Sequence, residues 1–97
     1  MYMIGNDNEL TQVLFRIEKG GEILAVFPYL SWKNSHRVMM YAHLGQHCEG
    51  AWSYVTDETW PATPAMSEPL KQELISAGYN LQVINLDEVN ESKMYQL

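Results

Sequence analysis

The sequence is short of cysteine and of basic residues, and each shortage excludes a class of protein. Its single cysteine, Cys48, can form no disulfide within the chain, which is typical of a reducing compartment. Lysine and arginine together number 6 against 12 acidic residues, which gives a formal net charge of −6. Because an acidic chain with scattered cations is repelled by phosphate, we expect no nucleic-acid partner.

Long apolar runs are missing as well. No stretch approaches the ~20 residues that a membrane-spanning helix needs. Residues 1–7 contain neither a basic group nor a long apolar segment, which argues against a secretory signal. We therefore expect a cytoplasmic protein with no membrane partner.

The 97 residues, of which 46% are hydrophobic and 19% charged, are typical of one globular domain. We expect a single domain over residues 1–97. Its ordered core should span about residues 11–86, and the polar segment 87–97 should be a frayed tail.

The hydrophobic pattern predicts a β-hairpin near the start of the chain. Alternating apolar and polar residues over 12–18 indicate a half-buried strand, with Arg16 on its polar side. Gly20 and Gly21 supply a tight turn. The following run, 23–27, is apolar on both faces and predicts a central strand, which Pro28 ends because proline has no N–H for the ladder.

Further along the chain the pattern is mixed. Residues 37–44 alternate as a third strand, although their methionine and alanine also favour a helix. Residues 45–50 begin and end with glycine and predict a loop. The segment 51–56 is rich in strand-forming residues and predicts a short fourth strand, and 81–86 predicts a last one.

A helix is predicted over 64–77, ended by Gly78. Thr63 can cap it, with Pro64 in the first turn. Alternatively Ser67 is the cap, which would place Pro69 harmlessly in the first turn. The apolar stripe of this helix consists of Met66, Leu70 and Leu74. Together these elements predict an α+β fold: a small antiparallel β-sheet in the order β-β-β-(β)-α-β, with one helix packed on one face.

One polar cluster is a candidate site, made up of Tyr41, His43, Gln46, His47 and Cys48. His43, His47 and Cys48 are residue types that bind zinc. Alternatively, a histidine activates the Cys48 thiolate for hydrolysis, although the neighbouring Glu49 would raise the pKa of that thiol. The competing interpretation is a polar loop whose histidines bond to backbone or water. Since the ligand set is incomplete, we expect no cofactor.

The aromatic residues divide into two groups. Phe15, Phe27 and Trp52 are predicted in the core. Tyr29, Trp32 and Trp60 are candidates for an interaction surface, because tyrosine and tryptophan are enriched where proteins bind one another. The edges of so small a sheet also favour self-association, for example as a homodimer.

Three stretches of the sequence resemble a family of small bacterial, phage and mobile-element proteins without an assigned activity. They are 14–28, the segment Tyr41–His47 with its His-Leu-Gly-Gln-His motif, and 61–81. The resemblance covers about residues 13–84. It implies a recurring domain and assigns no catalytic residue.

Size, acidity, surplus aromatics and the lack of a catalytic motif lead to one functional hypothesis. We expect an accessory domain that binds a protein partner or itself, without catalytic activity. The alternative is a metal-binding or small hydrolytic protein that uses His43, His47 and Cys48.

Overall fold

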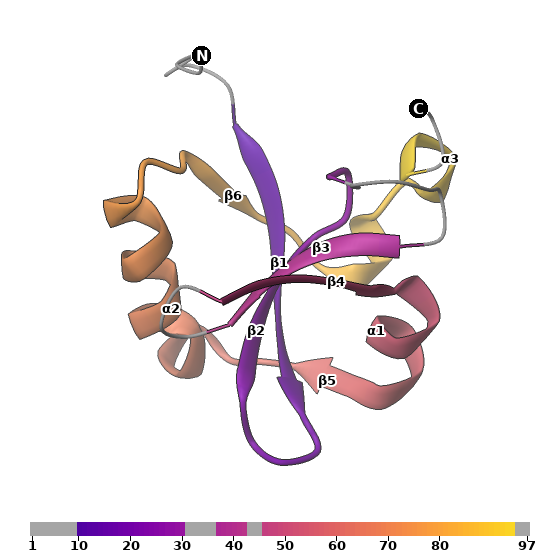
Figure 1. Cartoon of the computed structure of the whole chain (residues 1–97), viewed down its shortest axis with the longest axis horizontal. Coiled ribbons are helices and arrows are strands. Elements are labelled where there is room, and N and C mark those ends of the chain that lie inside the picture. Colours follow the sequence, from indigo (N-terminus) through magenta and orange to yellow (C-terminus); the bar gives the residue numbers. More distant parts are fainter. Residues whose placement is uncertain (1–9, 31–36, 43–45, 95–97) are drawn as a thin grey trace.

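A computed structural model of the chain describes residues 10–30, 37–42 and 46–94 (Figure 1). Its strands are β1 (Thr11–Glu18), β2 (Ile23–Phe27), β3 (Arg37–Ala42), β4 (Gln46–Ala51), β5 (Thr59–Pro61) and β6 (Leu81–Val83). Its helices are α1 (Trp52–Glu58), α2 (Pro64–Ser76), the 3-10 turn η1 (Leu86–Glu88) and α3 (Glu91–Met94). The predicted α+β class is confirmed.

The sheet is ordered β4-β3-β2-β1-β5, and each of these neighbours is antiparallel. β2 is therefore central, as its two-sided apolar pattern predicted. The predicted hairpin between β1 and β2 is also confirmed: the Glu18 N–H donates to the Glu22 carbonyl over 2.9 Å, and Gly21 takes the positive φ of 92° that favours glycine.

The outer edge of β1 is shared by two short strands. β5 pairs with its second half, from Arg16 onward, and β6 pairs in parallel with Thr11–Val13. Leu14 and Phe15 lie between these two partners and pair with no strand residue on this edge. The break is short, because the Phe15 carbonyl accepts from the Ala62 N–H at 3.0 Å and the Val13 carbonyl from the Ile84 N–H at 2.9 Å. This gap positions the candidate site.

The sheet is covered on both faces. The first cluster, under α2, consists of Val13, Phe15, Ala25, Phe27, Tyr41, Leu70 and Leu74. The second, under α1, consists of Leu14, Leu24, Val26, Val38, Met40, Ala42, Trp52, Val55 and Ile84. Figure 1 shows α1 and α2 on opposite sides of the central strands. All three aromatics predicted in the core are buried.

The start of α2 is settled by its cap. The Thr63 hydroxyl accepts a hydrogen bond from the Met66 N–H at 3.1 Å, so the helix begins at Pro64 and Pro69 lies inside it. Met66 is 48% exposed and Ser67 is buried, so the predicted apolar stripe was right at its other two positions and wrong at Met66. The buried face of α2 is formed by Ser67, Leu70 and Leu74, at the helical spacings of three and four residues.

Two predictions for the middle of the chain were wrong. Residues 46–51 form β4 rather than a loop, because they complete a backbone ladder with β3. Residues 52–58 form α1 rather than a strand, and its buried residues, Trp52 and Val55, recur at a helical spacing of three. Tryptophan, tyrosine and valine have a high strand propensity, which is why the sequence predicted a strand here. The burial of Trp52 and Val55 on one helical face outweighs that propensity.

Residues 87–94, which belong to the segment 87–97 that we expected to fray, contact the rest of the domain together with Leu86. Leu86 and Val89 pack against the second cluster. The Asn90 N–H donates to the Tyr29 hydroxyl at 2.8 Å, and the Trp52 indole donates to Glu91 at 3.2 Å. This segment therefore forms one side of the site described next.

Candidate functional site

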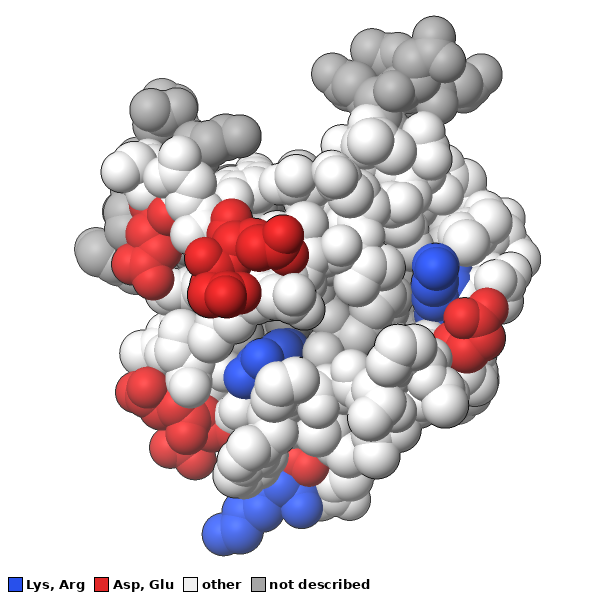
Figure 2. Space-filling model, turned by 180° about the vertical axis from the view of Figure 1, so that it is seen from behind, with Lys and Arg blue, Asp and Glu red and all other residues white. Residues whose placement is uncertain are grey.

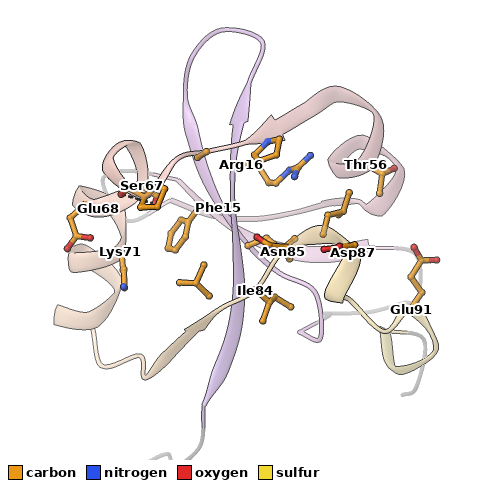
Figure 3. A pocket seen from close by; sticks show the side chains of 16 residues that line it. Phe15, Arg16, Thr56, Ser67, Glu68, Lys71, Ile84, Asn85, Asp87 and Glu91 are labelled. Carbon is orange, nitrogen blue, oxygen red and sulfur yellow. Dashed lines mark hydrogen bonds between the residues drawn. The ribbon is translucent and has the colours of Figure 1, made fainter.

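A cleft of about 860 Å³ lies over the gap at the outer edge of β1 (Figure 3). One wall is formed by the end of β5 and the first half of α2, and the other by the end of β6, η1 and α3. Thr56 of α1 contributes to the rim. The cleft reaches both faces of the sheet, because its floor, Leu14 and Phe15, contributes one side chain to each core cluster.

Most of the lining is apolar. It includes Leu14, Phe15, Pro61, Ala62, Val83, Ile84 and Leu86. Ligand sites in proteins are commonly clefts of roughly 300–1,000 Å³ with apolar walls and a few placed polar groups. The cleft has both the size and the composition of such a site.

Arg16 is the buried polar group of this cleft. Arg16 directly follows the floor residue Phe15 in β1, and although it is charged it is only 5% exposed. Its Nε donates to the Thr59 hydroxyl and its Nη2 to the Thr59 carbonyl, both at 2.9 Å. The Thr59 hydroxyl in turn donates to the Val55 carbonyl at 2.6 Å. Thr59 thus fixes the guanidinium at the junction of β5 and α1.

These two bonds leave part of the guanidinium without an acceptor. A guanidinium carries five N–H donors, and Thr59 accepts from two of them. Among the residues that the structure describes, no carboxylate forms an ion pair with Arg16. Burial lowers the pKa of Arg16, but an arginine remains charged in proteins. The cleft therefore contains a buried cation without a counter-ion from the described chain.

Charged side chains flank Arg16 on both sides. Figure 3 shows Glu68 and Lys71 of α2 at one end of the cleft and Asp87 and Glu91 at the other. Figure 2 shows this face as separate acidic and basic groups around a hollow rather than one field of a single sign. The buried cation therefore has two carboxylates on the side of Asp87 and Glu91, and a carboxylate beside a lysine on the side of α2.

The polar cluster predicted from the sequence lies mostly elsewhere. Tyr41 is buried under α2, and its hydroxyl donates to Glu73 at 2.5 Å. Gln46, His47 and Cys48 belong to β4, at the opposite edge of the sheet from β5, where they pair with Ala42, Tyr41 and Met40. Their side chains and the whole of His43 lie outside the described part of the structure. Within that part, no three histidine, cysteine, aspartate or glutamate residues are grouped as a metal site.

Two of the three aromatics proposed as an interaction surface, Tyr29 and Trp60, lie in the described residues. Trp60 of β5 is 53% exposed. Tyr29 is half-buried against the second cluster, where its hydroxyl accepts from Asn90. Trp32 lies outside the described residues. Trp60 and Tyr29 are thus in different surroundings, and only Trp60 is freely exposed.

Arg16 was missed by the sequence analysis, which placed it on the polar side of its strand. The sequence did contain one signal for its burial. Side chains two positions apart on a strand point to the same face of the sheet, so Arg16 lies on the face of Leu14, which is apolar and buried. What holds Arg16 is Thr59, where α1 ends and β5 begins, and neither element was predicted. The position of the guanidinium therefore depended on elements that the pattern did not show.

Comparison with known proteins gives no relative from which to assign a role. No protein family, curated protein or solved structure matches the chain. None of the helices in the described residues has the length and apolar character needed to span a membrane.

Proposed function

We propose that the domain is an interaction module without catalytic activity that binds a segment of a partner protein in the cleft beside β1. The observation that carries this proposal is the cleft itself, which is about 860 Å³ in volume, largely apolar, and placed at the short break between β5 and β6 along β1.

Exposed apolar side chains beside the cleft support a protein ligand. Val83, which lines it, is 49% exposed, and Trp60, which precedes the lining residue Pro61 in β5, is 53% exposed. Apolar side chains that face water next to a concave site are typical of docking surfaces. A segment bound along the gap would cover part of this area.

The proposal is tested by site-specific crosslinking. A photo-reactive amino acid is placed at Val83 in the cleft, and as a matched control at Ile75, which is 42% exposed on α2 and does not line the cleft. We expect a defined crosslinked species from position 83 and none from position 75. Mass spectrometry then identifies the attached segment.

Two outcomes would decide against it. If positions 83 and 75 give the same products, the cleft has no specific ligand. If the product at position 83 is a second copy of this chain, the cleft serves self-association and not a separate partner. A Trp60→Ala variant measures the contribution of the exposed aromatic to binding. Unchanged capture of the segment would show that Trp60 is not part of the binding surface.

A further inference from the structure

We propose that Arg16 is the recognition residue of the cleft and that it receives the side-chain carboxylate of an aspartate or glutamate in the bound segment. The inference deepens the proposed function and rests on it, since it names the chemistry of the ligand in the same cleft.

The first argument is the state of the guanidinium. Arg16 is 5% exposed, lines the cleft, and has donors left over after its two bonds to Thr59. A buried charge without a partner is unfavourable, because it has lost its water and gained no opposite charge. A carboxylate satisfies such a group best, because its two oxygens match the planar fork of arginine.

The second argument is the preorganised geometry. Thr59 accepts from both Nε and Nη2, so rotation of the guanidinium is already restricted in the free protein. Thr59 is itself fixed by its bond to the Val55 carbonyl. A donor group that is held before the ligand arrives loses less entropy on binding. Thr59 is therefore the positioning residue for Arg16.

The third argument is the pattern of charge along the cleft. Arg16 lies between Glu68 at one end and Asp87 and Glu91 at the other (Figure 3). These carboxylates, and the net charge of −6, oppose a highly anionic ligand such as a polyphosphate. They favour a segment whose acidic residue is followed by lysine or arginine toward Asp87 and Glu91, whereas at the other end Glu68 stands beside Lys71. An internal acidic residue fits the cleft better than a free carboxyl terminus, because the lining continues from Arg16 toward both ends and a chain end would leave one of them empty.

The minimal probe is hexanoate, an apolar monocarboxylate, compared with its neutral analogue hexanamide. Both are titrated at neutral pH into the ¹⁵N-labelled full chain, with the Arg16 Nε–H signal observed by NMR. We expect hexanoate to shift this signal and to bind about tenfold more tightly than hexanamide, the preference that one charge-assisted pair gives. The inference would be overturned if the two probes bound equally, or if hexanoate bound without shifting the Arg16 Nε–H signal.

Variants separate Arg16 from the other cation in the cleft. Arg16→Gln should remove the preference for hexanoate, whereas Lys71→Gln, at the α2 end, should keep it. The opposite result would place the carboxylate on Lys71 and contradict the proposal. Because the comparison of the two probes is made on the unaltered protein, it stands even if a variant folds poorly.

The source of the carboxylate is tested on the segment crosslinked at Val83. Changing its acidic residue to the amide should weaken capture by the unaltered domain and have little further effect on Arg16→Gln. If only amidation of a carboxyl terminus has this effect, the ligand is a chain end and our assignment is wrong. If Arg16→Gln captures the segment at position 83 as well as the unaltered domain does, the proposed interaction module is supported but Arg16 has no role in recognition.

Discussion

The indole N–H of Trp52 donates a hydrogen bond to the carboxylate of Glu91 over 3.2 Å, joining the first residue of α1 to the first residue of α3. Trp52 is buried in the core, whereas Glu91 is exposed and lines the cleft. The bond therefore ties one wall of the candidate site to the core of the domain.

Removing this acceptor should loosen α3 without unfolding the domain. We expect Glu91→Ala to lower the free energy of unfolding by about 1 kcal/mol, the usual net value of one such bond near the surface. Hydrogen exchange should accelerate at Trp52 Nε1 and over residues 91–94. Glu91→Gln keeps an acceptor oxygen and should behave nearly as the unaltered protein. Equal effects of both changes would show that charge, and not the hydrogen bond, matters there.

Replacing the buried cation should cost little stability. In Arg16→Met an apolar chain of similar length takes the place of a desolvated charge, and we expect the free energy of unfolding to stay level or to rise by up to ~2 kcal/mol. By contrast, Thr59→Val leaves the guanidinium without its side-chain acceptor and should cost roughly 1–3 kcal/mol. Urea titration measures both. A large loss in Arg16→Met would mean that this arginine serves the fold rather than a ligand.

The end of α2 offers a test of backbone geometry. Gly78 has a φ of 109°, and the Tyr79 N–H closes the last turn on the Leu74 carbonyl at 3.1 Å. We expect Gly78→Ala to lower the free energy of unfolding by about 1 kcal/mol, because a Cβ is strained at positive φ. Ser76→Ala, in the last turn of the same helix, is the control and should be nearly neutral in thermal denaturation.

The ionisation of Tyr54 should make the stability of the domain decrease at alkaline pH. Burial, then the charge and hydrogen bond of Glu18, and then Glu58 raise the pKa of this phenol. A raised pKa favours the protonated form in the folded state, so this contribution is complete below the ordinary tyrosine pKa and is lost as pH rises through the folded one. Spectrophotometric titration should show a late phenol component that Tyr54→Phe reduces. An unchanged late phase would assign it to another tyrosine.

The alternative built on His43, His47 and Cys48 predicts a different measurement. Under our proposal, protein purified without a histidine tag should contain no stoichiometric metal, and its melting temperature should not change with a chelator. One equivalent of zinc per chain, lost together with stability on chelation, would favour the metal-binding alternative.

The parts of the fold that follow from local patterns were predictable. The hairpin at Gly20–Gly21 and the helix from Thr63 to Gly78 combine periodic burial with turn or capping chemistry in adjacent residues. The boundary between β4 and α1 was not, because 46–51 has no apolar alternation and depends on its ladder with β3. The role of Arg16 was missed for a related reason, since its partner Thr59 lies where α1 ends and β5 begins.

The pairing of β6 with β1 has a consequence for the order of assembly. Thr11 and Leu81 are register partners although 70 positions separate them, so the outer edge of β1 cannot close until most of the chain exists. On the ribosome, the hairpin of β1 and β2 can form early from its local contacts, whereas the final strand must arrive late and over a long loop. Until then, the emerging polypeptide presents an open strand edge, and the time needed to synthesise the residues up to β6 sets how long that edge stays unpaired.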